Sequence, residues 1–296
     1  MKPLIHAFPD EAGPARRLAD TLQYRLALVE THSFPDGEVL PRVAPSTPTT
    51  ILYRSLNRPN EKIIELLLVA DGLRRAGAQK LILVAPYLPY MRQDKQFHPG
   101  EPVSQLVMTA LLNRTFDWIV TVDPHLHRVK SLHEILPRAS LVHGMDALAA
   151  YLRRFHFDAR TLVVGPDQES ELWVRRLSGQ LDLEAVVLEK QRHGDRSIEI
   201  SMPPGFDAAG RPVLLVDDIC SSGSTLCEVV RKLRSAGAQS VAVFVTHALC
   251  DASVLNQLRE AGADRLISSD ACVHRTNVVE LADALANSLR TDLALP

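Results

Sequence analysis

The stretch VLLVDDICSSGSTL, from Val213 to Leu226, combines two acids with a run of small hydroxyl residues. Small residues let backbone N–H groups close around phosphate oxygens, and serine and threonine hydroxyls add further donors. A helix that begins near Ser224 would direct its positive dipole end at the anion. The loop contains no lysine, which excludes the nucleotide-binding loop GxxxxGK[ST]. Because the paired acids Asp217 and Asp218 suit sugar hydroxyls or a metal ion, we predict a site for a phosphorylated sugar.

A plainer interpretation of this stretch is a strand–helix junction in which serine and threonine only cap the helix. The acids at the strand end weaken that interpretation, because ligands bind at the carboxyl ends of strands in parallel sheets. Cys220 lies inside the stretch, and its type and position favour a small buried thiol.

Short apolar, β-branched runs alternate with amphipathic segments along most of the chain. The predicted strands are Thr50–Tyr53, Leu81–Ala85, Trp118–Val122, Leu162–Val164, Ala185–Leu188, Val213–Val216 and Val241–Val245. The predicted helices include Glu61–Ala76, Val103–Asn113, Glu169–Leu177 and Leu226–Ala236. Continuous apolar strands separated by helices are typical of a parallel sheet covered on both faces, which predicts the α/β class.

Two segments of the chain are similar to each other. Leu73–Lys80 reads LRRAGAQK and Leu233–Ser240 reads LRSAGAQS, and each leads into an apolar run. Helix capping explains the glycine but not the shared flanks. We therefore predict a tandem duplication, with two similar domains that each contain a central, mostly parallel sheet flanked by helices. The expected boundaries are 1–145 and 146–296, and the last helix is free to pack back on the first domain.

Composition excludes several classes of protein. Lys plus Arg number 33 and Asp plus Glu number 35, so no global basic field would attract nucleic acid. The apolar runs are far shorter than a membrane span, and the N-terminal sequence lacks the pattern of a secretory signal. The four cysteines lack paired CxxC spacing, which argues against a disulfide scaffold or a structural zinc site. We expect a cytoplasmic protein.

The stretch VLLVDDICSSGSTL resembles the phosphoribosyl-diphosphate binding motif, which phosphoribosyltransferases and ribose-phosphate diphosphokinases share. Five further motifs choose the second group: FPDGE at 34–38, PYLPYMRQDK at 86–95, TVDPH at 121–125, GPD at 165–167 and EKQR at 189–192. They occur in the family's order across nearly the whole chain. The sequence is most similar to short archaeal-type members of the ribose-phosphate diphosphokinase (phosphoribosyl pyrophosphate synthetase) family. The resemblance implies a phosphoribosyltransferase-like fold in both domains.

The resemblance also implies an activity: transfer of the diphosphoryl group of ATP to the 1-hydroxyl of ribose 5-phosphate, giving AMP. It assigns Mg²⁺ as the cofactor, with His125 and Asp167 at the family's metal positions. Asp217 and Asp218 match the residues that hold the ribose hydroxyls. The residues that match the phosphate-binding loop are Ser221, Ser222, Gly223, Ser224 and Thr225.

Lys190 and Arg192 match the family's catalytic pair on a flexible segment. Arginine would brace the diphosphoryl oxygens with two parallel hydrogen bonds, and lysine would act as a point charge. Without the resemblance, EKQRHGDR would be interpreted as a solvated surface hairpin.

Two further motifs match ATP-binding residues of the family. Arg92, Gln93 and Asp94 match residues that face ATP. The adenine-binding loop is matched by Phe34, Asp36 and Glu38. In the family this loop reaches ATP from a neighbouring subunit, which implies a homo-oligomer with a shared ATP site.

The chain departs from the family's pattern in two places. Ser224 stands where the family usually has glycine in the phosphate loop, and serine can crowd a backbone that approaches phosphate. After Asp167 the chain has Gln168-Glu169-Ser170-Glu171, where the family usually has small residues. Carboxylates there would repel diphosphate unless they turn away or bind a cation.

These departures leave alternatives to an active diphosphokinase open. One is a catalytically silent relative that regulates a partner enzyme, although the retained Lys190, Arg192, Arg92 and His125 argue against it. Another is a variant that acts on a different phosphorylated pentose. A phosphoribosyltransferase is disfavoured, because the motifs of the first half are foreign to that group.

Overall fold

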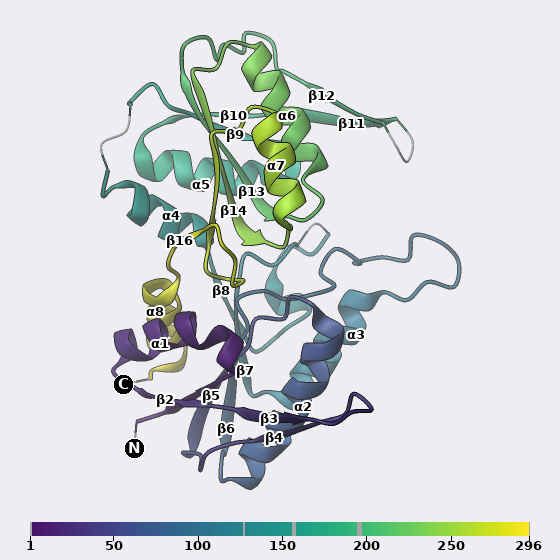
Figure 1. Ribbon diagram of the computed structural model, residues 1–296, viewed down its shortest axis with the longest axis vertical. Helices are drawn as coiled ribbons and strands as arrows, with labels where there is room; N and C mark the ends of the chain where they lie inside the picture. Colours follow the sequence, from purple (N-terminus) through teal and green to yellow (C-terminus); the bar gives the residue numbers. More distant parts are fainter. Residues whose placement is uncertain (1, 127, 156–157, 194–196, 296) are drawn as a thin grey trace. The chain divides into compact units, whose positions relative to one another are not determined.

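The computed structural model describes residues 2–126, 128–155, 158–193 and 197–295, and the side chains of 190–199 lie outside this description. The chain forms two compact units. Unit 1 comprises Met1–His143, Ala271–Val273 and Leu281–Pro296, and unit 2 comprises Gly144–Asp270 and His274–Glu280. Each unit contains one large sheet with helices on its faces (Figure 1).

The sheet of unit 1 has six parallel strands in the order β2-β1-β5-β6-β7-β8. Its strands are β1 (Leu4–Ala7), β2 (Arg25–Leu28), β5 (Thr49–Tyr53), β6 (Lys80–Val84), β7 (Trp118–Val122) and β8 (Ala139–Val142). An antiparallel hairpin, β3 (Glu30–Ser33) and β4 (Val39–Arg42), follows β2. The helices are η1 (Pro9–Glu11), α1 (Ala12–Leu22), α2 (Pro59–Arg75), α3 (Ser104–Thr115), η2 (Leu132–Glu134) and α8 (Ala282–Leu293).

The sheet of unit 2 has six strands in the corresponding order β10-β9-β13-β14-β15-β16, all parallel. Its strands are β9 (Leu162–Gly165), β10 (Glu184–Val187), β13 (Pro212–Cys220), β14 (Ser240–Ala248), β15 (Arg265–Ser269) and β16 (Asn277–Val279). The hairpin of this unit is β11 (Glu189–His193) and β12 (Ser197–Ser201). Its helices are α4 (Gly144–Leu152), η3 (Gln168–Ser170), α5 (Glu171–Leu181), α6 (Ser224–Ser235) and α7 (Ala252–Glu260).

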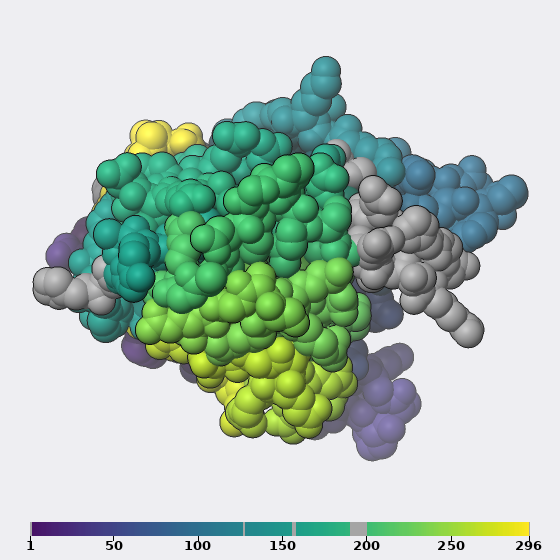
Figure 2. All heavy atoms as spheres, turned by 90° about the horizontal axis from the view of Figure 1, so that it is seen from above, coloured from purple at the N-terminus to yellow at the C-terminus, as the bar shows by residue number. Residues whose placement is uncertain are grey.

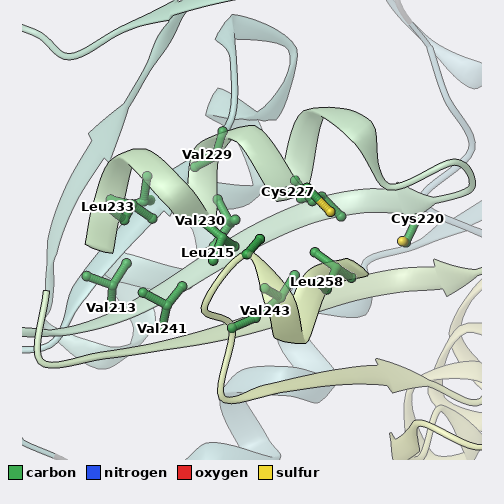
Figure 3. Packing of buried hydrophobic residues seen from close by; sticks show 14 of the residues in the cluster. Val213, Leu215, Cys220, Cys227, Val229, Val230, Leu233, Val241, Val243 and Leu258 are labelled. Atoms are coloured by element: carbon green, nitrogen blue, oxygen red, sulfur yellow. The ribbon is translucent and has the colours of Figure 1, made fainter. Parts of the chain in front are cut away.

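The central strands are continuous apolar runs because helices cover both of their faces. In unit 2, β13 and β14 contribute aliphatic side chains that meet those of α6 and α7 in one cluster (Figure 3). The labelled members are Val213, Leu215, Cys220, Cys227, Val229, Val230, Leu233, Val241, Val243 and Leu258. On the outside of this cluster, α6 and α7 lie side by side (Figures 1 and 2).

The two sheets share one topology, which confirms the predicted α/β class with two similar domains. In both units a hairpin follows the edge strand, and the next strand enters the middle of the sheet. The similar segments LRRAGAQK and LRSAGAQS end α2 and α6 and lead into the equivalent strands β6 and β14. The loop after β5 is therefore the counterpart of the loop after β13.

Helix α8 packs against α1 within unit 1, at the end of the chain (Figure 1). Arg290 Nη2 donates to the Thr21 carbonyl oxygen at 2.8 Å. Thr21 Oγ1 donates to Asp283 Oδ1 at 3.4 Å. The final helix is thus bonded to the first one, although 269 positions separate Arg290 from Thr21.

Buried charged side chains form hydrogen bonds with the backbone of the loop that follows β5. Lys62 has 11% of its side chain exposed, and its Nζ donates to Glu11 Oε1 at 2.6 Å and to the Ser55 carbonyl at 2.8 Å. The other Glu11 oxygen accepts from the Ser55 backbone N–H at 3.0 Å. Burial raises the pKa of Glu11 against the opposing charges of Lys62 and Arg54. The carboxylate of Glu11 therefore binds a backbone donor of this loop from within the molecule.

Arg54 extends the same network. Its Nη1 donates to Asp10 Oδ1 at 2.6 Å, and its Nη2 pairs with Glu65. The guanidinium carbon lies 3.8 Å from the centroid of the Phe8 ring, and only 4% of the Arg54 side chain is exposed. Buried cations of this kind are stable only while their carboxylate partners remain.

The substitution Glu11→Ala is expected to lower the free energy of unfolding by about 3–5 kcal/mol, because it leaves Lys62 buried without its main carboxylate partner. Urea denaturation followed by circular dichroism measures the change. Glu30→Ala is the matched control, since Glu30 forms an exposed ion pair with Arg42 and its loss should cost less than about 1 kcal/mol. Equal losses in the two variants would contradict a special role for Glu11.

Candidate active site

The loop between β13 and α6 is built around Gly223. This residue has φ +70°, and a Cβ added to it would lie 2.4 Å from Val254 Cγ1, so only glycine fits. Gly223 is the N-cap of α6 and provides no capping side chain. The free N–H groups of the first helical turn are therefore left to solvent or to a ligand, and the helix dipole favours an anion there.

Hydroxyl side chains surround this helix end. Ser221, Ser222 and Ser224 are exposed, and the Oγ atoms of Ser222 and Ser224 lie 3.2 Å apart. Ser224 is already the first residue of α6, so it adopts a helical backbone that needs no glycine. Serine in place of the family's usual glycine therefore causes no backbone strain at this position. The loop can hold phosphate with backbone and side-chain donors together.

The acids Asp217 and Asp218 lie within β13 rather than after it. The sequence predicted a strand that ends at Val216, but the pairing with β14 continues to Cys220 opposite Ala248. The Asp218 backbone N–H donates to Asp217 Oδ1 at 2.9 Å. The prediction of the strand end was wrong because acids are poor signals for a strand, and here the long β14 extends the ladder.

Asp217 is a strongly perturbed acid of this edge. Burial is the largest cause, and the neighbouring charges of Asp218 and Asp167 add to it, so the pKa of Asp217 is well above its ordinary value. Asp167 follows β9, the strand that pairs with β13. Unit 2 therefore brings three of the predicted site carboxylates together beside the hydroxyl loop.

The polar groups of Asp167 and the segment after it form hydrogen bonds with one another. The Asp167 side chain accepts from the Glu169 N–H at 3.1 Å and caps η3. Ser170 is buried and donates from Oγ to the Asp167 carbonyl. A Cβ on Gly165 would lie 2.1 Å from Ser170 Oγ, so the glycine of the GPD motif makes room for this turn.

The carboxylate of Glu171 is compensated within its own helix. Arg175 Nε donates to Glu171 Oε1 at 2.7 Å, and Arg175 Nη2 lies 2.6 Å from the same oxygen. This is the i,i+4 pairing that stabilises helix surfaces. The expected conflict between this segment and diphosphate is therefore reduced at Glu171, while Gln168 and Glu169 are exposed.

In unit 1 the motif FPDGE forms the turn of the β3–β4 hairpin. The Phe34 N–H donates to the Glu38 carbonyl at 2.8 Å, and Gly37 has φ +92°, which glycine permits. Asp36 Oδ1 accepts from the Glu38 N–H at 3.1 Å. The Phe34 ring is 39% exposed and packs edge-on against His32. An exposed aromatic ring on a rigid turn is a suitable surface for stacking a base.

Arg92, Gln93 and Asp94 follow β6 and a tight turn at Tyr90. Arg92 and Gln93 are exposed, as residues that contact a ligand must be. Asp94 differs, because only 2% of its side chain is exposed. Both of its oxygens accept from Arg128 Nη1, at 2.8 and 3.0 Å.

His125 is half-buried and follows β7 through a strained turn. Asp123 has φ +36°, which is rare for a residue other than glycine. Asp123 Oδ1 lies 3.3 Å from His143 Nδ1, and the Asp123 N–H donates to the Val142 carbonyl at 3.0 Å. Strained residues cluster at functional sites. The strain at Asp123 therefore supports a functional role for His125 beyond what its place in the sequence motif indicates.

Lys190 and Arg192 lie on β11, where their backbones pair with Ile200 and Ile198 of β12. Their side chains lie outside the described residues. The segment is therefore a β-hairpin, as the charge pattern indicated, and the catalytic assignment stays a prediction.

No group of three or more His, Cys, Asp and Glu side chains that could hold a metal occurs among the described residues. Magnesium needs no such cage, since it is commonly held by one or two carboxylates and by substrate phosphates. The donor set at the β9–β13 edge fits that mode, because the carboxylates of Asp167, Asp217 and Asp218 lie close enough there for the first and third to add to the effect of burial on the pKa of Asp217. Oxygen donors of this kind are also the ones Mg²⁺ prefers.

Sequence reasoning missed the residues that hold these groups in place. Asp123, His143 and Arg128 were not predicted, because each acts on a residue distant in sequence. The ion pair of Glu171 could have been predicted, because Arg175 lies four positions later on a predicted helix.

The fold and candidate site define a class of protein: a tandem α/β protein with a serine-rich strand-to-helix loop beside paired acids. A family model for the N-terminal domain of ribose phosphate pyrophosphokinase matches residues 8–115, and one for the phosphoribosyl transferase domain matches residues 131–282. None of the described helices combines the length and apolar character that a bilayer-spanning segment requires.

Relatives match the chain almost end to end. It is 33% identical over 276 residues to the ribose-phosphate pyrophosphokinase of Methanopyrus kandleri, covering 93% of this chain and 94% of the relative. It is 30% identical over 289 residues to that of Methanobrevibacter smithii, covering 93% and 96%. The crystal structure of phosphoribosylpyrophosphate synthetase from Mycobacterium smegmatis shares the fold, with a TM-score of 0.83, 24% identity and 99% coverage of both chains. The chain belongs to the ribose-phosphate pyrophosphokinase (diphosphokinase) family.

The raised pKa of Asp217 makes its ionisation destabilising for the folded state. The penalty is absent below the ordinary Asp pKa of about 4 and grows as the pH rises toward the folded-state value. Asp217→Asn, which keeps the acceptor for the Asp218 N–H, should therefore melt at a higher temperature than the wild type at pH 8. The difference should vanish below about pH 4. Thermal melts across this range, without divalent cations, measure it.

Asp251→Asn is the matched control, because hydrogen bonds from Ser253 and Val254 lower the pKa of Asp251. Ionisation of Asp251 stabilises the folded state, so this variant should be less stable than the wild type at pH 8. A destabilised Asp217→Asn at pH 8 would contradict the assignment of electrostatic strain to Asp217.

Proposed function

We propose that this protein is a ribose-phosphate diphosphokinase that converts ATP and ribose 5-phosphate into 5-phospho-α-D-ribose 1-diphosphate and AMP. The observation that carries the proposal is the loop after β13, where the first turn of α6 and several hydroxyls stand beside Asp217 and Asp218. Membership of the family supports the same conclusion. Neither a silent regulatory role nor a different phosphorylated pentose is favoured by any feature of the described residues.

Ribose 5-phosphate binds in this proposal through two groups of residues. The 5-phosphate accepts hydrogen bonds from the N–H groups of the first turn of α6 and from the hydroxyls of Ser221–Thr225. Asp217 and Asp218 accept hydrogen bonds from the ribose hydroxyls, and cationic ligands would relieve the charge that raises the pKa of Asp217. This arrangement orients the 1-hydroxyl, which must attack the β-phosphorus of ATP.

ATP binds in this proposal to residues of the first domain, taken as 1–145, while the second domain, 146–296, holds the sugar phosphate. The segment of Arg92, Gln93 and Asp94 forms one part of the ATP site, with Arg92 and Gln93 as its exposed residues. Phe34 and the hairpin turn form the other part and reach the ATP of a neighbouring subunit, so the site is shared. A turn that exposes the Phe34 ring suits this role.

Catalysis requires that charge on the transferred diphosphoryl group be stabilised. We assign this role to Lys190 and Arg192, whose strand β11 extends from the sheet in a two-stranded hairpin. Asp167 of unit 2 and His125 of unit 1 would each offer a ligand to Mg²⁺ beside substrate oxygens. When bound it would neutralise phosphate charge and align the diphosphate. Four free cysteines agree with a reducing, cytoplasmic location.

The decisive test is AMP release from ATP and Mg²⁺ by the purified protein. Release should require ribose 5-phosphate, and Lys190→Ala should lower kcat by about a hundredfold or more, because a transition-state contact is lost. Coupled enzymatic detection of AMP measures both. Ribose 1-phosphate serves as the control acceptor, because its 1-hydroxyl is blocked. AMP release that does not depend on ribose 5-phosphate would contradict the proposal.

The shared ATP site predicts an oligomer. Sedimentation velocity should show a species larger than the 32.7 kDa chain at the concentrations that support activity. Mixing the inactive variants Phe34→Ala and Lys190→Ala should restore part of the activity, because some sites would receive an intact residue from each subunit. A fully active monomer would contradict the shared site.

A further inference from the structure

Arg128 is an exposed cation fixed to a buried carboxylate beside the predicted ATP residues. Its Nη1 donates to both oxygens of Asp94, at 2.8 and 3.0 Å. The Asp94 side chain is 2% exposed, whereas that of Arg128 is 43% exposed. The pair therefore presents the guanidinium, and not the carboxylate, to solvent.

The segment that carries Asp94 is held on its other side by a neutral contact. Gln105 on α3 is buried, and its Nε2 donates to the Met91 carbonyl at 3.2 Å. The Gln105 N–H also donates to the Gln93 carbonyl at 3.2 Å. These bonds fix the backbone of Arg92 and Gln93 without any charge. The ion pair is thus not needed merely to attach the segment to its unit.

The positive charge that the Arg128–Asp94 pair exposes determines which ligand it can bind. ATP is strongly anionic, so a carboxylate that faces it is repelled unless a cation lies between them. A guanidinium has the right sign and offers paired donors to phosphate oxygens. Because a buried carboxylate keeps Arg128 in one position, less side-chain entropy is lost when ATP binds.

We propose that Arg128 is a further ATP-binding residue that contacts the polyphosphate, and that Asp94 is a positioning residue that acts through Arg128. The inference rests on the proposed function only for the identity of the nucleotide site. It assigns Arg128 to the same surface as Arg92 and Gln93. It also ties the segment after β7, which carries His125, to the segment after β6.

Four variants test the proposal: Arg128→Ala, Arg128→Lys, Asp94→Asn and the double variant Asp94→Asn/Arg128→Ala. Arg128→Ala should raise the KM for ATP about 10- to 100-fold, the range for loss of a charged hydrogen bond, and leave the KM for ribose 5-phosphate within about twofold. Arg128→Lys should be intermediate, because a point charge remains. Asp94→Asn should also raise the KM for ATP, and the double variant should be no worse than Arg128→Ala alone.

Non-additivity is the discriminating result. If Asp94 itself contacts ATP or its metal, Asp94→Asn would weaken ATP binding further in the Arg128→Ala background, which would overturn the positioning role.

Arg74→Ala is the matched control, since Arg74 pairs with Asp117 at 2.8 Å in the same unit. It should leave the KM for ATP unchanged. Calorimetric titration of each variant with a non-hydrolysable ATP analogue and Mg²⁺ measures affinity directly. This readout tests Arg128 even if the wild type forms no AMP, a result that would count against the proposed function alone. Equal analogue affinity in wild type and Arg128→Ala would overturn the assignment.

Discussion

Parallel pairing of the central strands is the constraint on which the proposed chemistry depends. All strands of a parallel sheet end at the same edge, and each is followed by a loop and a helix whose N-terminus faces that edge. In unit 2 this brings Asp167 after β9 next to Asp217 in β13, and it places the first turn of α6 beside both. In unit 1 the same geometry places Arg92 after β6 and His125 after β7. The polar residues are scattered in sequence, yet the sheet collects them at one edge of each unit.

The duplicated topology shows how two equivalent loops differ in the groups that surround them. After β5, the Ser55 N–H is bonded to Glu11, whose charge is balanced by Lys62 and Arg54. That loop is closed by the protein's own carboxylate. After β13, the helix starts at a glycine with no capping side chain, and burial together with the nearby acids Asp218 and Asp167 raises the pKa of Asp217. The first arrangement stabilises a domain, whereas the second leaves donors for an external anion.

The sequence predicted the parts of the fold that depend on continuous apolar patterns. The central strands β5, β6, β7 and β9 begin and end within a residue or so of the predicted ranges, because burial on both faces leaves a long apolar run. The short edge strand β2 is mostly exposed and gives no such signal. The hydroxyl loop and its acids could be predicted from their types and spacing. The Arg128–Asp94 pair could not, because its members are 34 positions apart and meet only through the pairing of β6 with β7.

The acidic edge of unit 2 disfavours the ionised form of Asp217. Burial and two neighbouring acids raise the pKa of Asp217, so the folded chain holds a carboxyl group that resists ionisation. The strand ladder to β14 keeps that group in place despite the repulsion. In the proposed site, a cationic ligand beside Asp217 would reduce this repulsion and favour the ionised carboxylate. The Arg128–Asp94 pair of unit 1 follows the opposite principle, since there the carboxylate is neutralised in advance and the cation is left to meet the nucleotide. In the proposed reaction, an acidic site for the sugar phosphate and a cationic site for the polyphosphate would be complementary requirements, and the two units would meet them with opposite charge arrangements.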